Sequence, residues 1–127
     1  MIHGHVVGLQ MRVNVPFRLP AQPDVAIEFV IDTGFQGELT LPRAAVAALG
    51  LSAFQQIVAN LADGRNVRTA AHLATILWDG VEREVAVLAL GARPLLGTGL
   101  LQGYALHTRF IDGAAVIIEK STQSNDW

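Results

Sequence analysis

Hydrophobic and polar residues alternate along the first part of the chain. Every odd position from Leu9 to Leu19 is apolar, and the even positions hold Gln10, Arg12, Asn14, Pro16 and Arg18. Alternation of this kind predicts a half-buried β-strand. Pro16 has no backbone N–H to donate to a neighbouring strand, so part of this strand should lie at a sheet edge or at a bulge.

Strand and turn signals continue beyond this segment. Residues 19–24 predict a turn, and Val25 to Ile31 predict a second strand that is mainly apolar and more buried. Three Asp-Gly pairs, at residues 63–64, 79–80 and 112–113, each lie between strand-like segments. Because Asp and Gly tolerate the positive φ of tight primed turns, each pair predicts a β-hairpin.

Helical segments are few and short. Residues 42–49 combine a proline suited to a first helical turn with helix-favouring alanines, and Gly50 follows as a stop signal. A second short helix is predicted over residues 98–102, closed by Gly103. Since the chain has no linker and no low-complexity tract, residues 1–127 predict one all-β, mainly antiparallel domain with a small, closed β-structure.

Composition narrows the class of protein. The chain has 127 residues, of which 51% are hydrophobic and 16% are charged, as expected for one compact domain with a modest core. Its formal charge is −2 and its basic residues are scattered singly, so we expect neither a nucleic acid nor a membrane as partner. The absence of cysteine excludes disulfides, thiol catalysis and thiolate metal sites. The first residues lack a signal-peptide pattern and no apolar run could span a bilayer, so a cytoplasmic location is expected.

A carboxylate directly follows the second predicted strand. Asp32 comes after the apolar residues 29–31, with Thr33 and Gly34 immediately behind it. A charged carboxylate at the end of an apolar strand is poorly hydrated unless donors or a second titrating group compensate. Gly34 exposes a backbone N–H and Thr33 offers a hydroxyl. Asp, Thr and Gly are also common in ordinary turns, but a second apolar strand at residues 39–41 favours a functional motif over a simple turn.

These residues resemble a motif of the retroviral-type (retropepsin-like), single-domain aspartic proteases, in particular their small bacterial relatives. Those relatives carry Asp-Thr-Gly-Phe-x-Gly-x-Leu-x-Leu-Pro, and the run from Asp32 to Pro42 matches every fixed position. The family's second landmark, two aliphatic residues and a glycine before a helix and a final strand, is similar to residues 95–97 with the segments 98–102 and 115–119.

The resemblance extends to the architecture. Residues 57–73, with Asp63-Gly64 at the tip, resemble the family's flap hairpin, and the likeness covers about residues 9–119. It implies a closed, retropepsin-like β-barrel with a flap and one or two short helices, and leaves residues 120–127 as a loose tail.

The resemblance also implies a mechanism that needs two copies of the chain. In this family each subunit supplies one Asp at a two-fold axis, which agrees with the single Asp-Thr-Gly of this sequence. Two carboxylates about 3 Å apart share one proton. The ionised Asp32 would take a proton from water while the protonated Asp32 of the second copy polarises a peptide carbonyl. The expected function is therefore a homodimeric aspartic endopeptidase acting on peptide or protein substrates, with no metal and no cofactor.

Site residues carry over by position in the motif. Asp32, Thr33 and Gly34 are assigned to catalysis: Thr33 would lock the two catalytic loops together and Gly34 would donate to the carboxylates. The expected substrate contacts come from the loop after the triplet, from the flap tip and from the second landmark, and they are Gln36, Gly37, Ala62, Asp63, Gly64 and Leu96.

An alternative keeps the fold without the chemistry. A protease-like domain could serve as a catalytically silent dimerisation or peptide-binding module. The intact triplet together with the intact Leu95-Leu96-Gly97 favours the enzyme, because a pure binding module has no need of an exposed, paired carboxylate.

Other candidate sites have simpler interpretations. His3 and His5 alternate on one face but are too few for a metal site and are expected on a frayed terminus. His72 and His107 are expected to be satisfied strand residues, since no Ser or Cys nucleophile motif accompanies them. Residues 91–103 are rich in glycine but lack the pattern of a phosphate-binding loop. Trp78 is expected to anchor the end of a hairpin.

Overall fold

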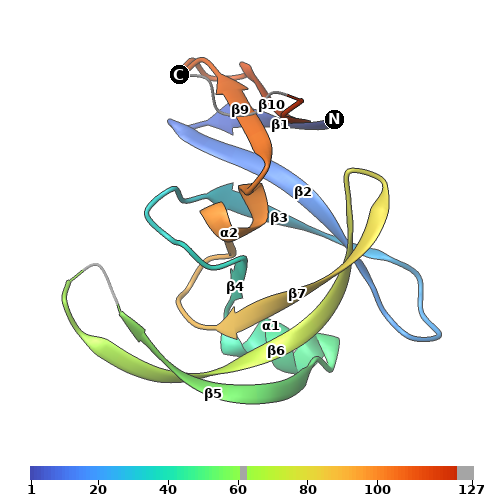
Figure 1. Cartoon of the computed structure of the whole chain (residues 1–127), viewed down its shortest axis with the longest axis vertical. Coiled ribbons are helices and arrows are strands. Elements are labelled where there is room, and N and C mark those ends of the chain that lie inside the picture. The colour runs from blue at the N-terminus through green and yellow to red at the C-terminus, as the bar shows by residue number, and fades with distance from the viewer. Residues whose placement is uncertain (61–62, 123–127) are drawn as a thin grey trace.

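The structure is a computed structural model that describes residues 1–60 and 63–122. These residues form ten strands and two short helices (Figure 1). In chain order the elements are β1 (Ile2–Val7), β2 (Gln10–Arg18), β3 (Val25–Ile31), β4 (Leu39–Leu41), α1 (Arg43–Leu49), β5 (Ser52–Asn60), β6 (Asn66–Trp78), β7 (Val81–Ala89), β8 (Leu95–Leu96), α2 (Thr98–Leu101), β9 (Tyr104–Thr108) and β10 (Ala115–Lys120).

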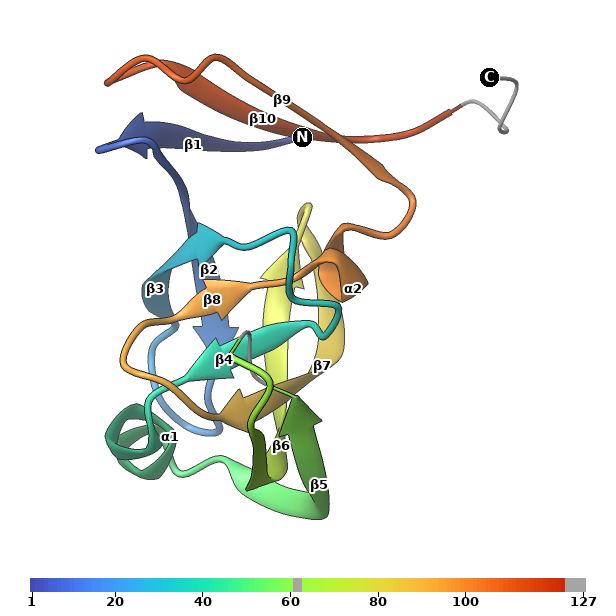
Figure 2. The same ribbon diagram turned by 90° about the vertical axis from the view of Figure 1, so that its left-hand side faces the viewer.

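All described strands belong to one curled sheet. Its order is β5-β6-β7-β4-β8-β3-β2-β1-β10-β9, and a further pairing joins β6 to β2. That pairing closes β2, β3, β8, β4, β7 and β6 into a ring, while β1, β10 and β9 form a separate layer beside it (Figure 2). Only β3–β8 and β4–β7 pair in parallel. The predicted all-β, mainly antiparallel fold is confirmed, and the predicted closed barrel takes the form of this ring.

The core fills the ring with the inward side chains of all six of its strands. Val13, Val15 and Phe17 alternate into it as predicted, and the ring of Phe17 stacks on Phe29 with centroids 5.9 Å apart. The prediction that Leu9 faces inward is wrong. Leu9 lies in the turn between β1 and β2 with φ +64°, and it is 71% exposed.

Pro16 lies where β2 has an open side. On one side β2 pairs with β3, where Pro16 faces Ala26. On the other side β2 pairs with β1 only through residues 10–13 and with β6 only through residues 17–18. The predicted edge position of Pro16 is therefore confirmed.

The strand before Asp32 is less buried than predicted. In β3 only Phe29 and Ile31 are buried, whereas Val25 and Ala26 are exposed. The reason is that β8 pairs only with Val30 and Ile31, so the first part of β3 has β2 as its single neighbour.

The Asp-Gly pairs form turns of different kinds. Asp79 and Gly80, with φ values of +54° and +79°, form the tight β6–β7 turn, as predicted. Residues 112–113 belong to a longer connection between β9 and β10, and residues 63–64 belong to the β5–β6 connection. A further tight turn at residues 8–9, which joins β1 to β2, was not predicted.

Both ends of the described chain are more ordered than expected. The N-terminus is not frayed: β1 pairs with β2 and with β10, and it carries His3 and His5 as exposed side chains. β10 continues to Lys120, and residues 123–127 of the expected loose tail lie outside the described residues. β9 was also not predicted, because its pattern lacks a clear alternation.

Both predicted helices are confirmed within one residue at each end. Pro42 precedes α1 and Gly50 ends it in the left-handed conformation, with φ +67°. α2 ends at Leu101. Neither described helix is long and apolar enough to cross a membrane. Trp78, at the end of β6, is 3% exposed and packs edge-on against Tyr104, which agrees with its predicted role as an anchor.

Candidate active site

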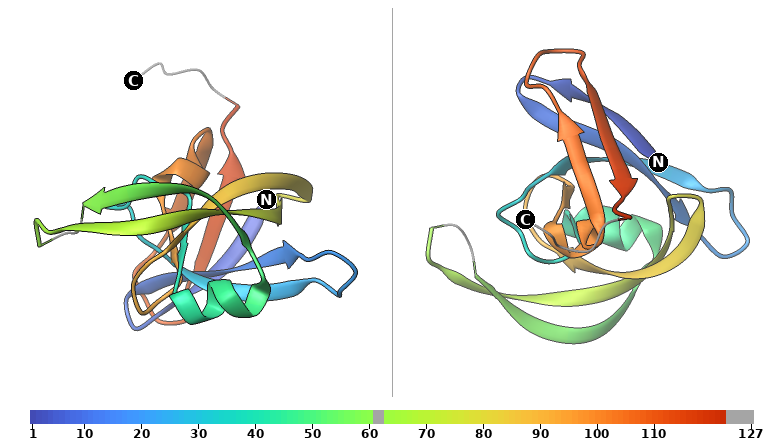
Figure 3. Two further views of the ribbon diagram at one scale, coloured as in Figure 1. Left: turned by 90° about the horizontal axis from the view of Figure 1, so that it is seen from below. Right: turned by 45° about the horizontal axis from the view of Figure 1, so that its top comes forward.

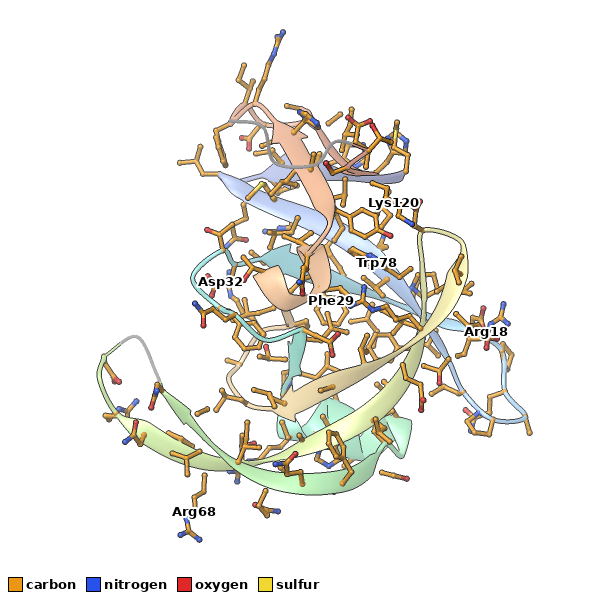
Figure 4. The ribbon with its side chains drawn as sticks, in the orientation of Figure 1. Arg18, Phe29, Asp32, Arg68, Trp78 and Lys120 are labelled. Carbon is orange, nitrogen blue, oxygen red and sulfur yellow. The ribbon has the colours of Figure 1, made fainter. Side chains whose placement is uncertain are left out.

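Asp32 begins the loop that joins β3 to β4. Its backbone N–H donates to the carbonyl of Leu96 at 2.9 Å, which continues the parallel β3–β8 pairing by one residue. Its side chain is half-buried, on the side of the ring toward which the β5–β6 hairpin extends (Figure 4). The strand register therefore determines where the carboxylate lies.

The residues after Asp32 turn back toward its carboxylate. The Gly34 N–H donates to Asp32 Oδ1 at 2.9 Å, and the Phe35 N–H donates to the Asp32 carbonyl at 3.1 Å. A Cβ at Gly34 would lie 3.3 Å from Asp32 Oδ1, closer than ordinary contact. Thr33, between them, is exposed. One carboxylate oxygen is thus held by the backbone, and the hydroxyl of the next residue lies on the surface.

Residues 97–99, which lead from β8 into α2 and are called the second loop here, brace the first. The Thr98 N–H donates to the Phe35 carbonyl at 2.8 Å, and the Gly97 N–H donates to the Glu38 carbonyl at 2.9 Å. The Gly99 N–H donates to the carbonyl of residue 37 at 3.1 Å. Three backbone hydrogen bonds between two loops restrict their relative movement, and with it the position of Asp32.

Glycine is required where these loops meet. A Cβ at Gly97 would lie 2.6 Å from Phe35 O and closer still to Gly37 O, and a Cβ at Gly99 would lie 2.9 Å from Gly37 O. A Cβ at Gly37 would itself collide with the ring of Phe35, at 2.7 Å from Cε1. The glycines of residues 91–103 that were considered for phosphate binding therefore include two that permit close loop packing.

Glu38 ties the same loop to β7. Glu38 Oε1 accepts from the Ala86 N–H at 2.8 Å, and Oε2 accepts from Arg83 at 3.2 Å. Nearby, Thr40 is buried and its Oγ1 accepts from the Leu95 N–H at 3.1 Å. Sequence reasoning missed both residues. For Glu38, a carboxylate directly before an apolar strand was a signal that it needs a partner.

The sequence-predicted substrate residues lie in different settings. Gln36 is exposed and Gly37 is half-buried, both in the loop after Asp32. Leu96 is 0% exposed, so its side chain packs in the core, and only its carbonyl reaches Asp32. Because this side chain is buried, it does not reach the surface where a substrate would bind.

The predicted flap residues belong to the β5–β6 hairpin. The hairpin begins at Ser52, earlier than the predicted residue 57, and both of its strands curve along one side of the ring (Figure 1). Asp63 and Gly64 are exposed, and Asp63 accepts from the N–H and the guanidinium of Arg65. Ala62 lies outside the described residues.

The two strand histidines differ. His107 Nε2 lies 3.1 Å from Glu119 Oε1, so it has a partner as expected. For His72 the expectation is wrong: Nδ1 is buried and has no hydrogen-bond partner among the described residues. His72 faces a cavity rather than a neighbouring polar group, and that cavity is considered below. Within the same residues, no group of three or more His, Cys, Asp or Glu could hold a metal.

Comparisons with known proteins address the fold. No protein-family model matches the sequence, and no curated protein sequence matches it significantly. Among solved structures, a retropepsin-like aspartic protease from Rickettsia conorii is similar, with a TM-score of 0.61 and 20% identity, over 93% of this chain and 89% of that one. The EIAV protease in complex with the inhibitor HBY-793 is similar with a TM-score of 0.54 and 22% identity, over 76% of this chain and 91% of that one.

Both similar structures are aspartic proteases whose chains are covered almost completely. At this level of identity the likeness concerns the arrangement of strands, which agrees with the ring and with the motif at residues 32–42. The chain therefore has the retropepsin-like aspartic protease fold.

Proposed function

We propose that the protein is an aspartic endopeptidase, active as a homodimer, in which Asp32 of each copy forms one catalytic pair. The observation that carries the proposal is the setting of Asp32. The carboxylate ends a ring strand, Gly34 holds one of its oxygens, and two hydrogen-bonded loops position it in a retropepsin-like fold.

The single chain supplies one such carboxylate, so a second copy must supply the other. Two surface features support this assembly. Thr33 exposes its side chain directly beside Asp32, where the equivalent loop of a second copy would meet it. β9 is the last strand of the sheet in the described chain, so its outer edge offers unpaired backbone groups to another strand.

The chemistry follows from one proton shared by the pair. The ionised Asp32 accepts a proton from water as the water oxygen bonds to the peptide carbonyl carbon, and the protonated Asp32 of the other copy donates to the carbonyl oxygen. The first carboxyl then protonates the leaving nitrogen, and a hydroxyl of the tetrahedral intermediate returns a proton to the second carboxylate. The C–N bond breaks, and the pair again holds one proton.

The β5–β6 hairpin would cover the substrate. Asp63 and Gly64 would contact the peptide backbone from the hairpin end, Ala62 is proposed as their neighbour in that contact, and Gln36 would bind from the opposite loop. Closure of the hairpin would exclude water other than the attacking molecule.

The direct test is peptide cleavage. A mixed peptide library is incubated with the full chain from pH 4 to 7, and the fragments are identified by mass spectrometry. Asp32→Asn should abolish every cleavage. Asp24→Asn is the matched control, because it makes the same chemical change in an exposed turn, where Asp24 pairs with Arg18. Equal fragments from Asp32→Asn and from the wild type would contradict the proposal.

The shared site is tested by mixing subunits. If each active site needs Asp32 from two copies, equal amounts of wild-type and Asp32→Asn chains that exchange freely leave about half of the activity per wild-type chain. Activity that stays unchanged on mixing would exclude a shared pair. A folded dimer that cleaves no peptide would instead favour a silent, peptide-binding module.

A further inference from the structure

A cavity of about 520 Å³ lies between α1 and the base of the β5–β6 hairpin. Figure 3 shows α1 beside this hairpin when the molecule is seen from below. The wall of the cavity is formed by residues of α1 and the following turn, by both hairpin strands and by the end of β7. Arg68 extends away from Asp32 (Figure 4), and no residue of the Asp32 loop lines this cavity, so it is separate from the candidate active site.

The two charged side chains of the wall are both arginines. Arg43 from α1, and Arg68 and His72 from β6, line the cavity, and no Asp or Glu lines it. Two arginines and no carboxylate therefore line one cavity in a protein whose formal charge is −2.

The two cavity arginines are exposed and have no carboxylate partner among the described residues, which also holds for Arg93 and Arg109. Arg12, Arg18, Arg65 and Arg83 each lie within ion-pair distance of a carboxylate. Within the residues that the structure covers, neither Arg43 nor Arg68 has a hydrogen bond or an ion pair through its side chain. Their guanidinium groups are therefore available to a ligand.

His72 adds an unsatisfied polar atom to the same wall. Its Nδ1 is buried and has no partner among the described residues. A buried polar nitrogen without a partner costs free energy, and the ring that carries it forms part of the same wall. Gln56 and Thr69 supply further polar groups, although the Thr69 hydroxyl already donates to Ala89 O at 2.6 Å.

We propose that this cavity binds a small anionic molecule that carries at least two phosphate or carboxylate groups. Guanidinium groups bind both kinds of oxyanion through paired, charge-assisted hydrogen bonds. A cavity of about 520 Å³ exceeds the size of a single inorganic anion and falls in the range of small-molecule sites. Arg43 and Arg68 bind the anionic groups, and the His72 ring lies on the same wall.

The ligand would connect two elements that are close in the fold but belong to different segments. Arg43 follows β4, which leaves the Asp32 loop, whereas Arg68 and His72 belong to the hairpin. A bound anion would hold the base of the hairpin against α1. The site itself does not depend on peptidase activity, so its test reads binding and not turnover.

The test is an NMR titration of the full, isotope-labelled chain at constant ionic strength. Pyrophosphate is the phosphate probe and citrate is the carboxylate probe. Saturable binding of at least one probe is expected, with amide shifts concentrated at residues 43–51 and 68–72 and a change in the His72 Nδ1 resonance. The stronger probe identifies the oxyanion class.

Arg43→Gln and Arg68→Gln should each weaken binding by about ten-fold or more, since each removes a charge-assisted contact. Arg109→Gln is the matched control: it removes one exposed positive charge from the β9–β10 connection and should leave the affinity unchanged. The amide spectra of the variants show directly that they remain folded. Absence of saturation with both probes, or equal weakening by Arg109→Gln, would overturn the proposal.

Discussion

Replacing Gly97 by alanine tests the contact between the two loops behind Asp32. Gly97 has φ −99°, a conformation that alanine adopts without strain, so the substitution causes no backbone strain. The added Cβ would instead lie 2.5 Å from Phe35 Cδ2, 2.6 Å from Phe35 O and closer still to Gly37 O. Two of these three atoms are backbone oxygens, which cannot move by a change of rotamer.

The magnitude follows from these contacts. Overpacking in a well-packed region costs about 1–3 kcal/mol when side chains can adjust. Here the loops must separate, which also weakens the hydrogen bonds that Gly97, Thr98 and Gly99 donate, each with a net contribution of about 1 kcal/mol. We expect a loss of about 3–5 kcal/mol in the free energy of unfolding. Glycine-to-alanine replacement at an unstrained site would have the opposite sign, a gain of about 0.4–1 kcal/mol.

Urea unfolding followed by circular dichroism measures this loss. At slopes of about 1–3 kcal/mol per M, a loss of about 3 kcal/mol lowers the midpoint by roughly 1–3 M. All variants are compared at one protein concentration, because the proposed dimerisation would stabilise the folded chain. The peptidase rate should also fall, since a displaced loop moves Asp32.

Gly103→Ala is the control for the backbone. Gly103 has φ +84° and an added Cβ would meet no atom within 4 Å, so this variant reports conformational strain alone, about 1–2 kcal/mol. Gly97→Ala should therefore be the less stable of the two variants. If Gly97→Ala is as stable as the wild type or more stable than Gly103→Ala, the loop contact does not carry the role assigned to it.

Three further predictions follow from other contacts. Glu38→Gln should lower the free energy of unfolding by about 1 kcal/mol in the same urea assay, since it removes the charge that pairs with the half-exposed Arg83; an unchanged midpoint would show that this pair contributes nothing measurable. Thr69→Val, which keeps the shape of the side chain, should cost about 1–3 kcal/mol because the carbonyl of Ala89 loses its buried donor, and a neutral effect would mean that water replaces the hydroxyl. In the proposed mechanism the Asp32 pair holds one proton, so peptidase activity should follow a bell-shaped profile on the acidic to neutral side, and a rate that is flat from pH 4 to 9 would contradict a shared proton.

Local sequence signals determined the elements around the site. The apolar run at residues 25–31 and the short strand at residues 39–41 were predictable, because alternation and β-propensity depend on near neighbours. The same holds for α1, with Pro42 before it and Gly50 after it, and for the tight turn at residues 79–80. The Asp-Thr-Gly motif itself identified the candidate carboxylate before any fold was known.

The elements that were missed lack such local signals. β9 has no regular alternation, since its residues are mostly half-buried between β10 and an open edge. The first strand, β1, contains two histidines and a glycine, a composition that predicts a frayed terminus. In the structure it is a strand because it pairs with β2 and β10. Pairing with neighbouring strands of the sheet, rather than propensity, makes both segments extended.

The curvature of the sheet decided what surrounds the carboxylate. Gly97 and Gly99 have no room for a side chain, because the ring brings them against residues 35–38, some sixty positions earlier in the chain. Glu38 finds its partners on β7, and His72 faces a cavity instead of a polar neighbour, for the same reason. A sequence pattern records which face of an element is apolar, whereas the atoms opposite that face depend on how strands far apart in the chain pair. The sequence therefore determined which residue carries the candidate chemistry, and the tertiary structure decided which groups hold it in place.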